Sequence, residues 1–475
     1  MKTSLSLKTA LIPLIVLIGL LAFNVIVFGD DALSGSNQFI LLIGGAVAAM
    51  VGFANKISYQ IMLDKVADNL KSVTGAILIL LFVGALAGTW LISGVIPAMI
   101  YYGLQILHPS IFLPACVIIC ALISLATGSS WTTSATVGIA LIGIGKALGI
   151  PVGMVAGAVL SGAYFGDKLS PLSDTTNLAP AMAGADLFTH IRYMTHTTLP
   201  SIGVTLIVFI ILGIGFSADG SANSQELLIA MNEVFTINLF LFIVPILVIV
   251  MIVKKTPPLM ALFVGTLLGA LAALIFQQEL LLSLSGESRL SVFGTYQVIM
   301  DAITVSTQIE TTSPALSDLF HSGGMQGMLG TIWLIICAMV FGGVMDAIGA
   351  LATISTALLS MAKSTFQLFA STVASCLAIN ITASDQYLSI VVPGKMFEKA
   401  YQDRDLAPEN LSRTLEDSGT VTSVLIPWNT CGAYQSGVLG VDVSQYFFYA
   451  IFNWLSPFMT LFFAAFHMKI KRLSS

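Results

Sequence analysis

Charged residues are scarce in this sequence. Lysine, arginine, aspartate and glutamate together make up 9% of its 475 residues, against roughly 25% in soluble globular proteins. Hydrophobic residues make up 56%, and the mean hydropathy is +0.95. This composition excludes a soluble domain and predicts an all-α membrane protein that crosses the bilayer many times. The net charge of −5 is small for this length, and we expect no nucleic-acid partner.

Motifs for metal, redox and hydrolytic chemistry are also missing. The five cysteines form neither a Cys-x-x-Cys pair nor a cluster with histidine, so we expect no structural metal and no disulfide framework. No Walker P-loop, Gly-x-Ser-x-Gly or His-Glu-x-x-His pattern occurs. The sequence therefore predicts neither an ATP-driven pump nor a membrane hydrolase. We expect no enzyme activity and no cofactor.

Long apolar segments follow one another along the whole chain. The first, from Leu11 to Phe28, is too long for a signal-peptide core, and no Ala-x-Ala-like site ends it, so it predicts a first transmembrane helix. We expect 10 to 13 spans plus re-entrant pieces. The segments lie at about 9–28, 38–54, 73–106, 110–126, 136–165, 198–216, 235–253, 258–276, 328–347, 349–380, 386–400, 411–426 and 444–468.

The distribution of basic residues predicts the orientation, because cytoplasmic loops are enriched in lysine and arginine. The connections 217–234 and 277–326 contain one basic residue, Arg289, and are expected outside. Residues 277–326 are expected to form a partly helical external loop, and both termini are expected in the cytoplasm of a bacterial inner membrane. The basic residues assigned to the cytoplasmic side are Lys2, Lys8, Lys56, Lys65, Lys71, Lys254, Lys255, Lys469, Lys471 and Arg472.

Polar and charged side chains interrupt the apolar pattern between Gly166 and Asn177. Pro171 breaks any helix there and frees backbone carbonyls. At membrane depth, irregular polar backbone is tolerated only inside protein or beside a wet cavity. The segment is therefore either a surface loop between two helices or an ion or substrate site on a broken helix. Lys168 is expected to be a counter-charge for Asp167 or part of an Asp–Lys clamp between two halves of the protein.

A second irregular region resembles the first at a constant spacing. Thr127 corresponds to Thr382 and Asp174 to Asn429, both 255 residues apart (382 minus 127, 429 minus 174). The span near residue 72 is expected to start inside and the span near residue 328 outside, so the two repeats are expected to be inverted. Unrelated polar loops in a channel or an enzyme remain the alternative. The expected units are 1–72 (N-terminal helices), 73–216 (first repeat with a re-entrant hairpin), 217–327 (connecting helices and external loop) and 328–475 (second repeat with a re-entrant hairpin).

The polar side chains of both regions are suited to cation binding. Sodium takes carboxylate, hydroxyl and carbonyl oxygens, and a proton needs a carboxylate whose affinity responds to its surroundings. The expected cation ligands are Ser173, Asp174, Thr175, Asp417, Asn429 and Thr430, with Asp174, Asn429 and Thr430 as direct metal ligands. Substrate or coupling roles are expected for Ser129, Ser130, Trp131, Asp167, Thr176, Ser384, Asp385, Glu416 and Trp428.

Three stretches resemble the NhaC family of sodium/proton antiporters, and the likeness extends over roughly residues 40 to 465. They are Gly162-Ala-Tyr-Phe-Gly-Asp-Lys-Leu-Ser-Pro-Leu-Ser-Asp-Thr-Thr-Asn-Leu-Ala-Pro180, Thr127-Gly-Ser-Ser-Trp131, and Glu416-Asp-Ser-Gly-Thr-Val-Thr-Ser423 with Ile426-Pro-Trp-Asn-Thr-Cys-Gly-Ala433. The resemblance implies two inverted repeats with re-entrant hairpins, a scaffold domain and a transport domain that moves as an elevator, in a homodimer.

Two functions are consistent with this resemblance. The first is a Na⁺/H⁺ antiporter in which both ions occupy one site in turn, with Asp174 and Asp417 as the leading carboxylates. The second is a Na⁺-coupled carrier or exchanger of a small organic solute, such as malate and lactate or an amino acid. In that case Ser129, Ser130 and Thr430 would bind the substrate carboxylate. In both cases Na⁺ is the coupling ion.

Overall fold

The protein is almost entirely helical, as its composition predicts. The computed structural model describes residues 5–28, 35–216, 220–311 and 320–473. Within these ranges the strands are β1 (Thr307–Gln308) and β2 (His321–Ser322), which pair antiparallel. The elements of the first half are α1 (Leu7–Phe28), α2 (Ser36–Ala54), α3 (Tyr59–Ser72), α4 (Thr74–Ile92), α5 (Val95–Ile106), α6 (Pro109–Thr127), α7 (Ser130–Thr133), the π-helical turn η2 (Ser134–Gly138), α8 (Ile139–Ala147), α9 (Val152–Leu169), α10 (Asp174–Ala183), α11 (Leu187–Ile214) and α12 (Gly220–Val234).

The second half contains more short helices. Its elements are the 3₁₀ turn η3 (Leu239–Phe242), α13 (Ile243–Val253), α14 (Pro258–Phe276), α15 (Gln278–Ser285), α16 (Val292–Thr304), α18 (Gly324–Gly327), α19 (Leu329–Ala347), α20 (Ala350–Ser360), α21 (Thr365–Thr382), α22 (Gln386–Gln402), α23 (Pro408–Leu415), the π-helical turn η4 (Glu416–Thr420), the 3₁₀ turn η5 (Ser423–Leu425), α24 (Thr430–Leu439), α25 (Val443–Tyr446) and α26 (Ile451–Ala465).

Fewer helices are long enough to cross a membrane than the apolar segments predict. Eight helices of the described chain have the length and composition of a span, and a ninth results if the pair 227–234 and 239–253, bent by 85°, is counted as one. The difference from the expected 10 to 13 arises because long apolar runs are broken. Residues 73–106 form α4 and α5, separated at Gly94, whose φ is 79°. The molecule is thus a multi-pass membrane protein with several short, broken helices.

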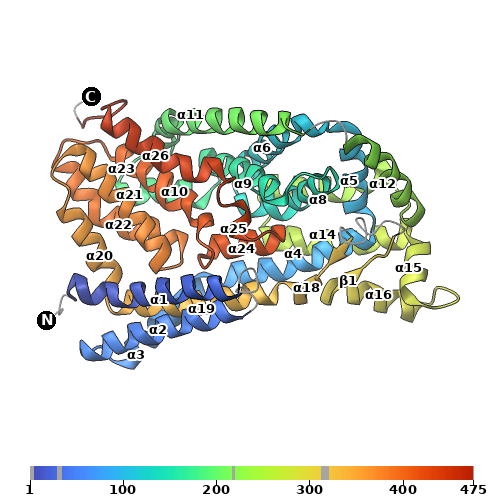
Figure 1. Cartoon of the computed structure of the whole chain (residues 1–475), viewed down its shortest axis with the longest axis horizontal. Helices are drawn as coiled ribbons and strands as arrows, with labels where there is room; N and C mark the ends of the chain where they lie inside the picture. Colours follow the sequence, from blue (N-terminus) through green and yellow to red (C-terminus); the bar gives the residue numbers. More distant parts are fainter. Residues whose placement is uncertain (1–4, 29–34, 217–219, 312–319, 474–475) are drawn as a thin grey trace.

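Most helices run along the longest axis of the molecule, and two flanks enclose the short helices (Figure 1). In this view α1, α2, α3 and α19 lie along the lower edge and α6 and α11 along the upper edge. One large apolar cluster joins α6, α8, α9 and α11, and a second joins α1, α2, α4, α14 and α19. The start of α1 and the end of α26 lie at the same end of the molecule, opposite α12, α15 and α16.

The connection 277–326 is partly helical, as expected. It contains α15, α16, the β1–β2 hairpin and α18. Its serine- and threonine-rich part around Pro314 lies in 312–319, outside the described residues.

Two stretches of the chain follow the same order of elements. Helices α4 and α19 have 19 residues each and begin 255 positions apart (329 minus 74), while α10 and α24 have 10 residues each and begin 256 apart (430 minus 174). Left-handed residues recur at the breaks in the pairs Gly94 and Gly349, Gly128 and Ser384, and Gly184 and Gly440.

The register of this match differs by one residue from the sequence expectation. Ser173 is the N-cap of α10 and Asn429 is the N-cap of α24. By position at the helix start, Asn429 therefore stands opposite Ser173, whereas the constant spacing of 255 residues places it opposite Asp174. The offset is 256 residues at these helix starts (430 minus 174) and 255 at the starts of α4 and α19.

Glycines bring α9 into close contact with α6. A β-carbon on Gly162 would lie 2.2 Å from the carbonyl oxygen of Val117, and one on Gly166 would lie 2.3 Å from that of Ala121. Small residues four apart allow two helix backbones to approach closely, and this packing is a main source of helix association in membranes. It places the C-terminal end of α9, with Asp167 and Lys168, against the end of α6.

We predict that Gly162→Ala destabilises the protein by about 1–3 kcal/mol, because the added methyl group cannot fit beside the α6 backbone. Gly203 in α11 is the matched control, since a β-carbon there meets nothing within 4 Å. Gly203→Ala should be neutral or stabilise by up to about 1 kcal/mol. The midpoint of thermal unfolding in detergent measures both. Equal midpoints for the two variants would contradict the close packing of α6 and α9.

Candidate functional site

The breaks between helices meet at one cavity of about 670 Å³. It lies where α7, α10, α22 and α24 begin, and each of these helices starts at a polar N-cap: Ser129, Ser173, Asp385 and Asn429. Nine of the residues expected to form the site line it. They are Ser129, Ser130, Trp131, Asp167, Ser173, Asp174, Thr175, Asp385 and Thr430.

Asp167 is a buried carboxylate at the end of α9. Its Oδ2 accepts hydrogen bonds from the backbone N–H of Ser130 (3.1 Å) and from the Ser130 hydroxyl (2.7 Å). Only 7% of the residue is exposed. The Thr176 hydroxyl lies 3.2 Å from the carbonyl oxygen of Asp167 and 3.1 Å from that of Lys168, so Thr176 caps the broken end of α9 and does not line the cavity.

Asp385 is the second buried carboxylate on the cavity. As the N-cap of α22, it accepts a hydrogen bond of 2.8 Å from the Leu388 N–H. The preceding residue, Ser384, has a φ of 58°, and its carbonyl accepts a bond of 2.9 Å from the Thr430 N–H. The start of α24 is thereby held beside the start of α22. Ser384 itself supports this turn and does not line the cavity.

Asp174 lies at the exposed side of the cavity. The Tyr387 hydroxyl donates a hydrogen bond of 2.8 Å to its Oδ2. The hydroxyls of Ser173 and Thr175 lie 3.2 Å apart next to it. A cation in the cavity would therefore meet hydroxyl and carboxylate oxygens contributed by α10.

Neither buried carboxylate is paired with a basic side chain in the part of the chain that the structure describes. The ion pairs there join Lys65 to Asp346, Lys168 to Asp417 and Lys471 to Glu409. Lys255 also lines the cavity, but it is exposed. A buried carboxylate without a partner is costly unless a cation or a proton neutralises it. Asp167 and Asp385 are therefore suited to hold one or the other.

Asp417 lies outside this cavity. Its Oδ1 is paired with Lys168, and its Oδ2 accepts hydrogen bonds from the hydroxyls of Thr197 (2.9 Å) and Thr460. Both charged residues are fully buried. The Asp–Lys clamp expected as one alternative is thus present, and it joins α9 to η4. The neighbouring Glu416 is also fully buried, and within the described ranges neither of its carboxylate oxygens has a partner with hydrogen-bond geometry.

Asn429 and Trp428 support the backbone beside the cavity. The Asn429 amide donates to the backbone and side-chain oxygens of Asn380, each at 3.1 Å, and its oxygen accepts from the Cys431 N–H at 3.0 Å. The Trp428 indole donates to the Ile381 carbonyl at 2.9 Å. Of the expected metal ligands, Asp174 and Thr430 line the cavity and Asn429 does not. The described ranges contain no group of three or more histidine, cysteine, aspartate or glutamate side chains that could hold a metal ion.

One wall of the cavity is aromatic. Trp131 stacks on Tyr434 with ring centroids 3.9 Å apart and an interplanar angle of 16°. The Tyr434 hydroxyl donates to the Trp131 carbonyl at 3.3 Å. Trp131 lines the cavity, and the fully buried Tyr434 packs against it, so the stack joins α7 to α24.

The chain is similar to known proteins over most of its length. A model described as the Na⁺/H⁺ antiporter family matches residues 162–468. The chain is 38% identical over 417 residues to the Na(+)/H(+) antiporter NhaC of Alkalihalophilus pseudofirmus. The matched region covers 88% of this chain and 87% of that protein. This chain belongs to the Na⁺/H⁺ antiporter family. The resemblance inferred from the three sequence stretches is confirmed.

Other proteins similar to this chain are named for different substrates. A malate-2H(+)/Na(+)-lactate antiporter of Bacillus subtilis is 36% identical over 88% of this chain and 86% of that protein. An arginine/ornithine antiporter, ArcD, of Halobacterium salinarum is 31% identical over 95% of this chain and 90% of that protein.

Several residues of the site are not predicted from the sequence. Gln386 and Tyr387 line the cavity, and their position directly after Asp385 at a helix start is a signal that identifies them. Thr197 and Thr460 bind Asp417, but each lies in a long apolar helix where threonines also bond their own backbone. Nothing in the spacing of these threonines distinguishes them.

We predict that Lys168→Met destabilises this antiporter family member by about 3–5 kcal/mol, because Asp417 is left as a buried charge without a partner. Adding Asp417→Leu should recover most of the loss. Lys65→Met is the matched control, since that ion pair is exposed and should contribute less than about 1 kcal/mol. Thermal unfolding in detergent compares the three. A double variant no more stable than Lys168→Met alone would contradict this role of the ion pair.

Proposed function

We propose that this protein exchanges Na⁺ for H⁺ across a bacterial cell membrane. The observation that carries the proposal is that two buried carboxylates, Asp167 and Asp385, face one cavity without a basic partner in the described chain. Membership of the Na⁺/H⁺ antiporter family supports it.

Binding of the two ions is mutually exclusive in this proposal. Sodium would be held by carboxylate oxygens of Asp167 and Asp385 and by hydroxyl oxygens of Ser130, Ser173 and Thr430. When Na⁺ leaves, the carboxylates would be left buried and uncompensated, so a proton takes its place. Binding of a proton likewise removes the charge that attracts Na⁺. Alternating occupancy of one site therefore couples the two ions.

This proposal assigns the ion-binding role to other carboxylates than the two that the sequence favours, Asp174 and Asp417. Asp174 is exposed at the cavity and accepts a hydrogen bond from the Tyr387 hydroxyl. It would attract Na⁺ to the cavity but would not be a ligand of the buried ion. Asp417 is already neutralised by Lys168 and lies outside the cavity. Asp167 and Asp385 take the leading places instead.

We further propose that residues 73–216 and 328–475 are inverted repeats that insert in opposite orientations. The equal order and spacing of α4–α10 and α19–α24 support a repeat, and the basic residues near the ends of the spans support opposite insertion. Residues 1–72 and 217–327 would then be the N-terminal helices and the connection. Both termini would face the cytoplasm. A transport domain moving as an elevator against a scaffold, in a homodimer, completes the proposal.

A Na⁺-coupled carrier of a small organic solute is the second candidate. The observation in its favour is the cavity size, because about 670 Å³ falls within the range of roughly 300–1,000 Å³ typical of small-molecule sites. Trp131, supported by the stacked Tyr434, would form a wall of such a site. The names of the malate/lactate and arginine/ornithine relatives support the same candidate.

We predict that Asp167→Asn and Asp385→Asn each lower Na⁺-driven proton movement by at least about a hundredfold, equivalent to about 2.7 kcal/mol. An amide can neither take up the proton nor balance the cation. The assay uses the purified protein in liposomes with an internal pH dye and an imposed Na⁺ gradient. The matched control is Asp64→Asn, an exposed carboxylate on α3, which should retain wild-type exchange. Unchanged exchange in Asp167→Asn would remove this carboxylate from the site.

The same liposomes decide between the two candidates. Under our proposal, a Na⁺ gradient alone moves protons. For an organic-solute carrier, protons or Na⁺ move only after malate, lactate or an amino acid is added. Trp131→Ala then provides a second test, because it should weaken uptake of an organic solute while leaving simple ion exchange within about twofold.

A further inference from the structure

A row of buried polar groups runs along α23 and η4, apart from the cavity. Glu409, Arg413, Glu416 and Thr420 follow one another at intervals of about one helical turn and are exposed by 6%, 0%, 0% and 1%. In the part of the chain that the structure describes, most of their side-chain polar atoms have no partner with hydrogen-bond geometry. These atoms are Oε2 of Glu409, Nε, Nη1 and Nη2 of Arg413, both carboxylate oxygens of Glu416 and the hydroxyl of Thr420.

Aromatic rings hold Arg413 in place without satisfying its N–H groups. The centre of the guanidinium lies 4.5 Å from the Tyr193 ring and 6.0 Å from the Phe463 ring. Such cation–π contacts stabilise the charge but leave the donors free. Arg413 forms no ion pair within 4.0 Å in the described chain, although Glu409 and Glu416 lie on the same helical run.

Water is the ligand that fits this row. Buried donors and acceptors are satisfied in nearly all proteins, by protein groups or by ordered water. Arg413 needs acceptors, whereas Glu409 and Glu416 need donors, and a water molecule supplies both. Buried waters make about three hydrogen bonds to such groups. The imidazole Nε2 of His190 on α11 is a further group without a partner, and its Nδ1 lies 2.7 Å from the Ser412 hydroxyl on α23.

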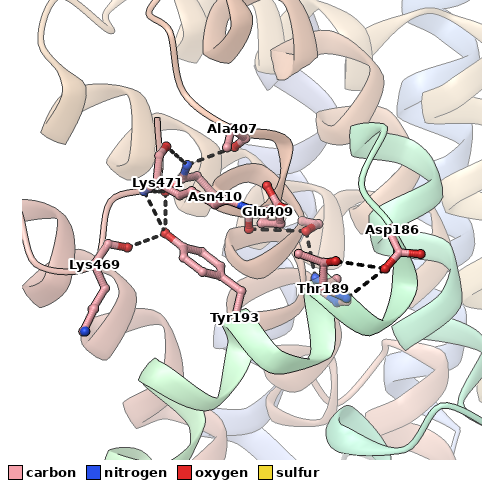
Figure 2. Close-up of polar contacts among 10 residues, drawn as sticks. Asp186, Thr189, Tyr193, Ala407, Glu409, Asn410, Lys469 and Lys471 are labelled. Atoms are coloured by element: carbon pink, nitrogen blue, oxygen red, sulfur yellow. Dashed lines mark hydrogen bonds and ion pairs between the residues drawn. The ribbon is translucent and has the colours of Figure 1, made fainter. Parts of the chain in front are cut away.

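The outer end of the row lies under the last described residues of the chain, 467–473, here called the C-terminal strap. Lys471 forms an ion pair with Glu409 at 2.7 Å, and Glu409 Oε1 is the atom that it contacts. Figure 2 shows Tyr193 of α11 and Asn410 of α23 converging on the strap. Asn410 donates to the Lys471 carbonyl at 2.7 Å, and the Ala407 N–H donates to it at 3.0 Å. The row thus begins at a partly exposed ion pair.

The inner end of the row reaches the proposed ion site. Glu416 is followed in the chain by Asp417, which pairs with Lys168, and Lys168 directly follows Asp167 at the end of α9. Asp167 in turn lines the cavity. The row therefore connects the strap at the surface with a carboxylate of the cavity.

We propose that a file of ordered waters along α23 and η4 carries protons between the C-terminal strap and Asp167, while Na⁺ uses the cavity. The role in exchange rests on the proposed function. A proton passes from water to water, each O–H bond that forms being matched by one that breaks, and ends on the Asp167 carboxylate as Na⁺ leaves. Separate routes allow a proton to arrive before the cation has cleared the cavity.

The first test detects the waters directly, by radiolytic hydroxyl labelling of the full-length protein and mass spectrometry. Tyr193 and Phe463, which flank Arg413, should be labelled several-fold faster than Phe369, a fully buried ring in an apolar cluster. The double variant Arg413→Met/Glu416→Leu removes the groups that hold the waters and should slow labelling of both rings. Thr420→Val is the milder variant if the double variant does not fold. Labelling of both rings as slow as that of Phe369 in the wild type overturns the water file.

The second test separates proton movement from Na⁺ binding. Thr420→Val and Glu416→Leu should slow Na⁺-driven proton movement in liposomes by about tenfold, that is about 1.4 kcal/mol in activation free energy, while the shift in unfolding temperature caused by Na⁺ stays unchanged. Gln435→Leu is the matched control, because Gln435 is a fully buried amide without partners on α24, outside the row. Wild-type rates in both row variants overturn the proton route. If the wild type itself moves no protons with Na⁺, the exchange function fails, and the labelling still decides the water file.

Discussion

The buried ion pair between Lys168 and Asp417 is the interaction on which the rest of the site depends. It joins the end of α9 to the π-helical turn η4, and Thr197 of α11 and Thr460 of α26 complete the bonds to Asp417. Four elements from both halves of the chain thus meet at one carboxylate. Taking two charges out of water is costly, and removal of either partner would leave the other uncompensated. The pair therefore ties η4 to the end of α9, where the neighbouring residue Asp167 lines the cavity.

The two kinds of buried carboxylate differ in their partners, and under the proposed function this difference distinguishes a structural carboxylate from an ion-binding one. Asp417 has a fixed cation from the protein, so it has no need of a mobile one. Asp167 and Asp385 have hydroxyl and backbone N–H donors but no basic partner in the described chain, so their charge is open to an exchangeable cation. Lys168 is adjacent to Asp167 in the sequence, yet it is paired with Asp417 across the molecule. Because consecutive side chains on a helix point about 100° apart, the last turn of α9 directs these two neighbours to different partners.

Breaks in helices are the second recurring feature. At each of four helix starts, a side chain of Ser129, Ser173, Asp385 or Asn429 accepts a backbone N–H that would otherwise have no partner at membrane depth. Each cap completes the start of its own helix, whereas the Ser130–Asp167 and Thr430–Ser384 hydrogen bonds join neighbouring breaks beside the cavity. In the proposed mechanism the same breaks let the site be reached without opening a continuous helix. The proposed water file along α23 and η4 has a similar feature, because its inner end lies at the π-helical turn η4.

Composition and motif determined the class of this protein by themselves. The low charge and long apolar runs required a multi-pass helical membrane protein, because unpaired charge is excluded from lipid. Three short stretches around Asp167, Ser130 and Asp417 identified its family. Nine of the expected site residues meet at the cavity, because polar residues beside helix-breaking prolines and glycines have few other places to lie. The tertiary structure alone decided which carboxylates are free. The pairing of Lys168 with Asp417 spans 249 residues of sequence, and no local pattern records it. The same holds for the isolation of Arg413 between two rings, because packing between distant helices sets these contacts.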